Sequence, residues 1–279
     1  MYQKVWKRSY GGICILNFYS LKGIRFESYT GFKYGRYLIT TDEVAKIDRP
    51  YEVEMGFMKE DGVTLRESVK ITYKDFNNRM LKGSTESYAG FVLVDIDFPQ
   101  FDNIPSLKLS NSDTFAVGSP VAIIGHQWEQ NNLAIKTGIL SSHYLHQGKK
   151  LQMYDVSTDR GNAGAPLIDA ETCEVIGMVG QRLSTIHEEY KSLMNVINAN
   201  IESLKLSEGK LTLNDIDPIQ VLIANQYQIK HLAQEVFRKA SFTYGYAIPI
   251  NYVCEFFDIA ELEKDIVYIS VENNSTEEI

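Results

Sequence analysis

Two pairs of residues have the types and spacing that could support chemistry. Asp42 and Glu43 are adjacent carboxylates, and two close carboxylates can raise the pKa of one of them, which suits general acid-base work. Adjacent residues on a strand point to opposite faces, however, which weakens this pair. His143 and His146 in SSHYLHQGKK could bind a metal ion from one face of a helix. Gly148 and the strand pattern before the pair indicate a loop, so we predict surface histidines and no metal site.

The cysteines do not add a site. Cys14, Cys173 and Cys254 are odd in number, widely spaced and without a C-x-x-C pair. That pattern favours buried reduced thiols over a disulfide framework or a cysteine metal site. We predict no cofactor.

The residues from 10 to about 182 form short apolar runs bounded by Gly, Asn, Asp and Ser, such as ICILNFY, FVLVDI and PVAIIG. This pattern is typical of a domain of many β-strands. The pattern FTYGYAIPI at 242–250 again predicts a strand and turn. From Asn251 we predict a short helix with Val253, Phe256 and Phe257 facing inward, and then a disordered polar tail at 272–279.

Between about 184 and 240 the apolar spacing changes from that of strands to that of helices. The first predicted helix carries a stripe of three-to-four spacing, made of Ile186, Tyr190, Leu193, Ile197, Ile201 and Leu204. Asp217 and Pro218 predict the start of a second helix. Its stripe is Ile219, Leu222, Ile229, Leu232 and Val236. The sequence therefore predicts a helical hairpin inserted in a β protein.

Composition excludes some classes of partner. The 279 residues are 44% hydrophobic and 23% charged, which is ordinary for a globular chain, and the formal net charge is −8. No basic face is available for a phosphate backbone, so we expect no direct nucleic-acid partner. No run approaches the length of a membrane span and the N-terminal residues lack a secretory signal, so we expect a cytoplasmic protein without a membrane partner.

The segment TDRGNAGAPLIDAETCEVIGMV at 158–179 resembles the nucleophile region of trypsin-like serine proteases, especially the HtrA-type bacterial branch, in which the motif reads GNSGGP. Five other segments resemble the same branch in the same order: GRYLITTDEVA at 35–45, GFVLVDID at 90–97, VGSPVAIIGH at 117–126, IKTGILS at 135–141 and YGYAIPINYV at 244–253. The resemblance implies an all-β, chymotrypsin-like fold of two six-stranded β-barrels, with the helical hairpin inserted in the second barrel.

The catalytic residues that the resemblance implies are missing. The family needs a serine nucleophile, a histidine base and an orienting carboxylate. The matching positions hold Ala163, Glu43 and Gly90. Losing the triad as a unit lowers kcat by about 10⁶-fold in a comparable protease. We therefore predict a protein that is not an enzyme, with Glu43 filling the vacated histidine position, either solvated or bonded to backbone.

An alanine at the nucleophile position is also a common laboratory substitution. The alternative is therefore a serine endopeptidase inactivated at Ala163. The other two positions argue against it, because Glu43 and Gly90 depart from the family pattern as well.

The resemblance leaves a remnant site that could bind without cleaving. It places the backbone N–H groups of Gly161 and Ala163 at an oxyanion hole, where a carbonyl or carboxylate could dock. It places Ser157 at the base of the first specificity pocket, and Gly180, Gln181 and Arg182 on the edge that pairs with an extended peptide. The helical insertion begins directly after this edge, which leaves three readings open: a lid, a docking surface, or decoration.

The predicted organisation has four parts. Residues 1–115 form the N-terminal barrel, 116–183 with 241–265 the C-terminal barrel and terminal helix, 184–240 the helical insertion, and 272–279 the tail. The predicted function is that of an inactive trypsin-like scaffold or regulator. It would bind a protein or peptide through the insertion 184–240 or the remnant cleft. The resemblance implies a bacterial stress or defence system. A ligand or peptide sensor that uses the same cleft remains the other alternative.

Overall fold

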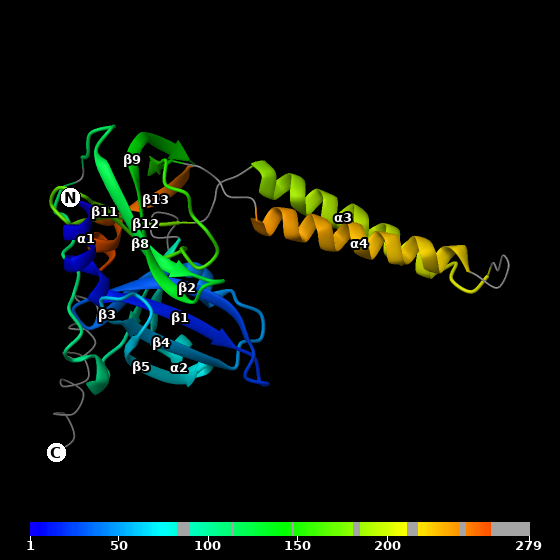
Figure 1. The fold of residues 1–279 in the computed structure, drawn as a ribbon, viewed down its shortest axis with the longest axis horizontal. Coiled ribbons are helices and arrows are strands. Elements are labelled where there is room, and N and C mark those ends of the chain that lie inside the picture. Colours follow the sequence, from blue (N-terminus) through cyan, green and yellow to red (C-terminus); the bar gives the residue numbers. More distant parts are fainter. Residues whose placement is uncertain are drawn as a thin grey trace, which may run out of the picture. The chain divides into compact units, whose positions relative to one another are not determined.

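The computed structural model describes residues 1–82, 90–112, 114–146, 148–180, 185–210, 217–239 and 244–257. They form two compact units, one with all of the strands and the other with the helical segment Arg182–Phe242. Each unit is described by itself below (Figure 1).

The N-terminal half of the strand-bearing unit is a seven-stranded antiparallel sheet in the order β5-β4-β1-β2-β3-β7-β6. Its strands are β1 (Ile13–Tyr19), β2 (Arg25–Tyr34), β3 (Tyr37–Thr41), β4 (Glu52–Met58), β5 (Leu65–Thr72), β6 (Met80–Lys82) and β7 (Phe91–Asp95). The helical elements of this half are α1 (Tyr2–Ser9), η1 (Tyr10–Gly12), η2 (Asp42–Ala45), α2 (Tyr73–Asn78) and η4 (Pro99–Phe101).

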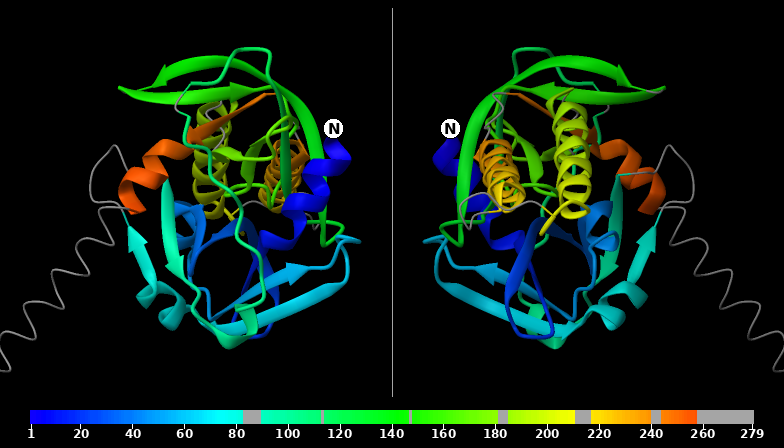
Figure 2. Two further views of the ribbon diagram at one scale, coloured as in Figure 1. Left: turned by 90° about the vertical axis from the view of Figure 1, so that its left-hand side faces the viewer. Right: turned by 90° about the vertical axis from the view of Figure 1, so that its right-hand side faces the viewer.

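Alternating apolar residues explain why this sheet curls around a core of its own. Leu16 and Phe18 of β1, Leu38 of β3, and Val92 and Val94 of β7 belong to one buried cluster. Strands that place every second side chain on one face can bury that face only if the sheet bends over it. Figure 2 shows the blue to cyan strands of this half wrapping around a common interior.

The C-terminal half is a closed barrel in the strand order β10-β13-β12-β11-β8-β9. The strands are β8 (Pro120–Gln127), β9 (Asn132–His146), β10 (Lys149–Tyr154), β11 (Pro166–Asp169), β12 (Val175–Val179) and β13 (Gly245–Pro249). Residues 250–257 continue directly from β13 as a helix. The inward direction predicted for this helix is correct for Val253 and Phe256, which are buried in the core.

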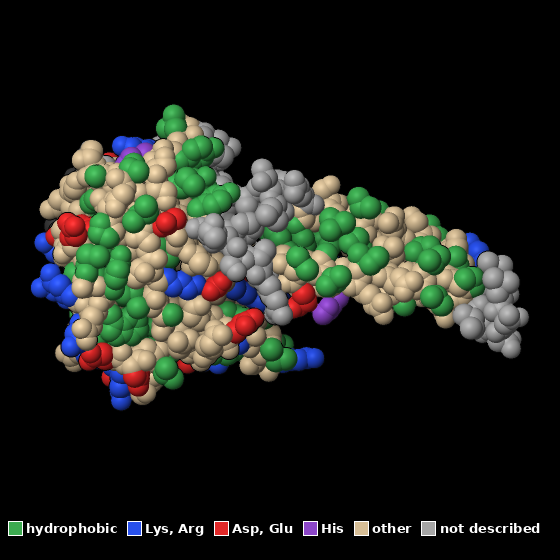
Figure 3. Space-filling model, turned by 45° about the horizontal axis from the view of Figure 1, so that its top comes forward, with side chains coloured by type: hydrophobic (Ala, Val, Ile, Leu, Met, Phe, Trp, Pro, Cys, Tyr) green, Lys and Arg blue, Asp and Glu red, His purple; other side chains and the backbone are tan. Residues whose placement is uncertain are grey.

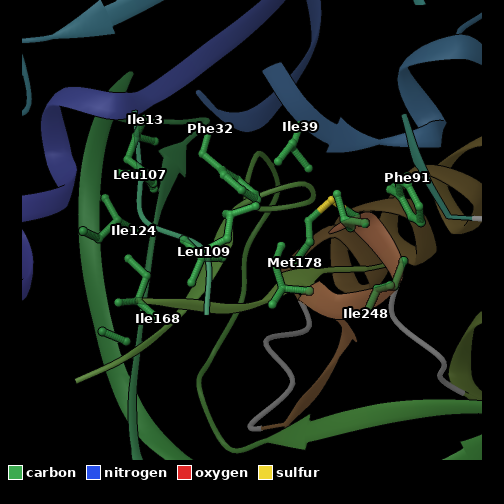
Figure 4. Packing of buried hydrophobic residues seen from close by; sticks show 14 of the residues in the cluster. Ile13, Phe32, Ile39, Phe91, Leu107, Leu109, Ile124, Ile168, Met178 and Ile248 are labelled. Atoms are coloured by element: carbon green, nitrogen blue, oxygen red, sulfur yellow. The ribbon is translucent and has the colours of Figure 1, made fainter. Parts of the chain in front are cut away.

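One large apolar cluster joins the two halves. Ile13, Phe32 and Ile39 of the first sheet pack in the same cluster as Ile124 and Ile168 of the barrel (Figure 4). The shared core fixes the first sheet against the barrel, so loops from both can contribute to one site. Cys14 and Cys173 lie in buried positions as free thiols.

The second unit is an antiparallel pair of helices, α3 (Thr185–Lys205) and α4 (Pro218–Lys239). The stripe predicted for the first helix is correct at Ile197 and Ile201, which are buried, and wrong at Leu193, which is 45% exposed. The stripe predicted for the second helix is largely exposed: Leu222, Ile229, Leu232 and Val236 lie in solvent, and Ile223 is buried instead. The helix is rotated by about one residue from the prediction, because its sequence offers two adjacent apolar stripes and only one of them faces α3.

The predicted fold class is confirmed, since the chain is mostly strand and has the two-part architecture of the chymotrypsin-like fold. The barrel has the six strands that were predicted, and the first sheet has seven among the described residues because the short β6 pairs with β7. The predicted tail at 272–279 lies outside the described residues. Within the described part, no helix is long and apolar enough to span a membrane.

Candidate functional site

The turn between Thr158 and Ala165 is the part of the barrel that carries the GNAGAP motif. Gly161 and Gly164 have φ angles of 97° and 85°, which L-residues with side chains rarely adopt. A Cβ on Gly164 would lie 2.1 Å from the Thr30 carbonyl oxygen and 3.0 Å from the Thr41 backbone nitrogen. The turn is therefore pressed against β2 and β3 of the first sheet, and only glycine fits at position 164.

Thr30 of β2 holds this turn through two hydrogen bonds and forms a third to His126. Its backbone N–H donates to the Ala163 carbonyl at 3.0 Å, and its hydroxyl donates to the Gly161 carbonyl at 2.6 Å. The same hydroxyl accepts the N–H of His126 at 2.9 Å. The sequence analysis missed Thr30. A threonine that is fully buried in a strand needs such partners, but its burial is not visible from the sequence.

Asn162 fixes the turn from the inside. Its side-chain oxygen accepts the N–H of Asp159 at 2.8 Å and the ammonium of Lys136 at 3.2 Å. Its amide donates to the His126 carbonyl at 2.9 Å. The side chain is therefore bonded at both ends, so the turn keeps its shape without any help from the residue at position 163.

The N–H groups of Gly161 and Ala163 donate no hydrogen bond to any described residue. Gly161 is buried, whereas Ala163 is partly exposed. Buried backbone donors normally have partners, so two unbonded donors two residues apart in a rigid turn are suited to an external carbonyl or carboxylate oxygen. The oxyanion hole expected from Gly161 and Ala163 stays a prediction, and these two N–H groups are the donors that it would use.

Glu43 lies on η2, directly after β3. The adjacent carboxylates Asp42 and Glu43 were predicted on a strand, which is wrong, since Thr41 caps a short 3₁₀ helix there and accepts the Glu43 N–H at 3.4 Å. Asp42 forms an ion pair with Lys46 at 2.7 Å. Burial is the main cause of the raised pKa of the Glu43 carboxyl, and the negative charges of Asp42 and Glu27 add to it while Lys46 opposes it.

Gly90 lies beside η2, because its carbonyl accepts the N–H of Asp42 at 3.3 Å. Its φ angle is 98°, and a Cβ there would lie 2.7 Å from Cδ1 of Ile248. The backbone at this position is therefore shaped for glycine, and an aspartate would meet both strain and a side-chain collision.

The three positions that were matched to the family triad, Glu43, Gly90 and Ala163, are brought together by these contacts. The Ala163–Gly164 turn packs next to Thr41, and Thr41 leads into η2, which carries Glu43. The N–H of Asp42 in the same η2 donates to the Gly90 carbonyl. Residues far apart in sequence thus meet where the first sheet faces the barrel.

The other predicted cleft residues are only partly described. Ser157 lies three positions after the end of β10 and is exposed. Gly180 follows β12, and its N–H donates to the Tyr246 carbonyl at 3.1 Å. Gln181 and Arg182 lie outside the described residues.

His126 is the histidine next to the turn. Its ring is fully buried, with Nδ1 2.6 Å from the Ser28 hydroxyl and Nε2 3.2 Å from the Asn131 side-chain oxygen. Burial lowers its pKa to about 4. Both ring nitrogens are thus engaged, and the imidazole is held neutral at physiological pH.

His143 and His146 were predicted in a loop, but they end the long strand β9. The hairpin with β10 extends the strand through both residues. His143 Nε2 lies 2.8 Å from the Phe115 carbonyl. No group of three or more His, Cys, Asp or Glu that could hold a metal ion occurs in the described parts of the chain.

Comparison with known proteins identifies relatives of this arrangement. Residues 29–178 match the family model of the trypsin-like peptidase domain. Among solved structures, a variant of the HtrA-type protease AlgW with a tripeptide is 18% identical, with a TM-score of 0.51 over 66% of this chain and 56% of that chain. AlgW itself with a tripeptide is 18% identical, with a TM-score of 0.50 over 64% and 54% of the two chains.

A third structure, Deg5, is 15% identical over 64% of this chain and 84% of that chain, with a TM-score of 0.49. This chain thus spans little more than half the length of the two AlgW chains, and at these identities the likeness shows the fold. None of the curated proteins that were compared matches the sequence.

Proposed function

Because this chain belongs to the trypsin-like peptidase family, we propose that it is a member without peptidase activity, which binds a protein or peptide instead of cleaving it. One observation carries the proposal. All three triad positions have departed from the family pattern, and at Gly90 the backbone itself has a conformation that aspartate does not favour. A laboratory substitution at Ala163 alone would leave the other two positions intact.

The chemistry of the residues present supports the loss of cleavage. The Ala163 methyl group has no lone pair with which to attack a carbonyl. Glu43 could accept a proton, but no imidazole stands between it and position 163. His126 lies under the turn with both ring nitrogens bonded, so it is not available as a base.

The proposed binding of a protein or peptide rests on the rigid turn. The unbonded N–H groups of Gly161 and Ala163 are suited to a carbonyl or carboxylate oxygen, and Asn162 and Thr30 hold the turn in place without a serine. A peptide or a peptide terminus is therefore the ligand class that we favour, and we expect a protein of the cytoplasm in this role.

The Ala163→Ser variant should remain inactive. A hydroxyl at this position would meet no general base, and loss of the triad lowers kcat by about 10⁶-fold in a comparable enzyme. Wild type and variant would be incubated with a library of unstructured peptides. Cleavage would be followed by mass spectrometry, and binding by the concentration-dependent rise in melting temperature.

We expect saturable stabilisation by a subset of peptides and no new fragments from either protein, with an active trypsin as the positive control. Measurable cleavage by Ala163→Ser would overturn the proposal in favour of an endopeptidase inactivated at this position. If no peptide raises the melting temperature, the proposed peptide binding is contradicted.

A further inference from the structure

The two helices of the second unit pack along one stripe each. The contacts are Ile197 and Ile201 of α3 and Ile223 of α4, which are between 3 and 9% exposed. The rings of Tyr190 and Phe237 stack at 4.0 Å, and the Lys230 ammonium donates to Asn198 Oδ1 at 2.8 Å. These pairs show that early residues of α3 lie beside late residues of α4, so the hairpin is antiparallel.

A second apolar stripe runs along the same hairpin and is exposed to solvent. Its side chains are between 45 and 64% exposed, and we call it the apolar flank: Leu193 and Val196 of α3 with Leu222, Ile229, Leu232 and Val236 of α4. Figure 3 shows hydrophobic side chains at the surface of the hairpin.

Helix geometry places these six residues on one side. Val196, Leu222 and Val236 each stand one position before Ile197, Ile223 or Phe237 of the packed stripe, and one residue is a rotation of about 100°. Leu193 lies three residues before Val196, and Ile229 and Leu232 lie seven and four residues before Val236, spacings that keep them on the same sides of their helices. In an antiparallel pair, the positions that precede the packed stripe fall on the same side of both helices. The positions that follow the packed residues fall on the opposite side and carry no large apolar side chain: Lys191, Asn198 and Glu202 of α3, with Ala224 of α4.

We propose that the apolar flank binds the same flank of a second copy of this chain, so that two hairpins form a four-helix bundle. In such a bundle each helix contacts two neighbours through stripes about a quarter-turn apart. The packed stripe supplies one of these contacts, and the apolar flank lies where the other is required.

Charge favours a second copy as the occupant. Residues 182–242 contain seven acidic and seven basic residues, so the whole net charge of −8 belongs to the rest of the chain. Two neutral hairpins can approach each other without the repulsion that opposes association of the strand-bearing units.

The available area is also sufficient. A helix of 21 residues is about 31 Å long, so two helices side by side offer a face of about 600 Å². Two such faces together remove about 1,200 Å² from solvent, which reaches the range of specific protein interfaces. This inference does not rest on the proposed function.

The test compares Leu232→Glu with Gln234→Glu in the full chain. Both positions are exposed, both flank Ala233, and both substitutions add one carboxylate. Molar mass would be measured by gel filtration with light scattering over a wide range of loading concentration. Circular dichroism would establish that each variant keeps its helix content.

We expect wild type and Gln234→Glu to have the mass of two chains and Leu232→Glu the mass of one. A wild type that stays at the mass of one chain at every concentration would overturn the proposal. So would an assembly that persists in Leu232→Glu, because it would not use the apolar flank.

Discussion

The Gly164→Ala variant is expected to lose about 4 kcal/mol or more of its free energy of unfolding, because a methyl group at this position collides with backbone that has no room to move. The Cβ would lie 2.1 Å from the Thr30 carbonyl oxygen and 2.5 Å from the Thr40 hydroxyl, which itself donates to that carbonyl at 2.7 Å. Relief would require the turn to separate from β2 and β3.

Gly118→Ala is the matched control. Gly118 has a φ of 93°, close to the 85° of Gly164, but a Cβ there would meet nothing within 4 Å. It should lose only about 1 kcal/mol, which is the cost of the left-handed backbone alone. Urea unfolding of the two variants distinguishes the cost of backbone strain, which both share, from the cost of the Cβ collision, which only Gly164→Ala has. Equal losses of unfolding free energy would contradict the close packing of the turn on the first sheet.

The stability of the protein should fall steeply as the pH is lowered from 7 to 4, by about 3 kcal/mol from His126 alone. Burial lowers the pKa of His126 from 6.5 to about 4 in the folded state. Below pH 6.5 the unfolded chain takes up a proton that the folded chain refuses, so the unfolded state gains stability. The contribution is therefore complete above pH 6.5 and is lost progressively as the pH approaches 4.

The measurement is the pH dependence of urea unfolding in wild type and in His126→Gln, which carries no titrating group. Wild type should lose about 3 kcal/mol more than the variant between pH 7 and pH 4. Parallel curves for the two proteins would contradict the buried, neutral imidazole. Direct NMR titration of the ring supplies a second measurement if the variant is too unstable.

The sequence predicted the fold because its strand patterns and six ordered motifs do not depend on which residues occupy the triad positions. TDRGNAGAP needs its glycines for the turn, and Gly161 and Gly164 indeed have positive φ angles. A serine at position 163 is not needed for this shape, so the turn is recognisable with Ala163 in its place.

Other features of the site were not predictable from single positions. Thr30 is one of many strand threonines in the sequence, and its three bonds to the turn and to His126 depend on how the first sheet meets the barrel. Likewise, the sequence shows two apolar stripes on the second helix but not which of them faces α3. The choice of Ile223 over Leu222 is made by packing, and a rotation of one residue exchanges the buried and exposed sets.

Reaction of Ala163→Ser with a fluorophosphonate would show whether the site lacks a functioning catalytic apparatus independently of Ala163. This reagent labels serines that are activated by a neighbouring base, and it requires no knowledge of the natural substrate. The intact mass of the treated variant should equal that of the untreated variant, with wild type as the blank. A stoichiometric adduct on the hydroxyl introduced at position 163 would contradict the account and would identify an active peptidase.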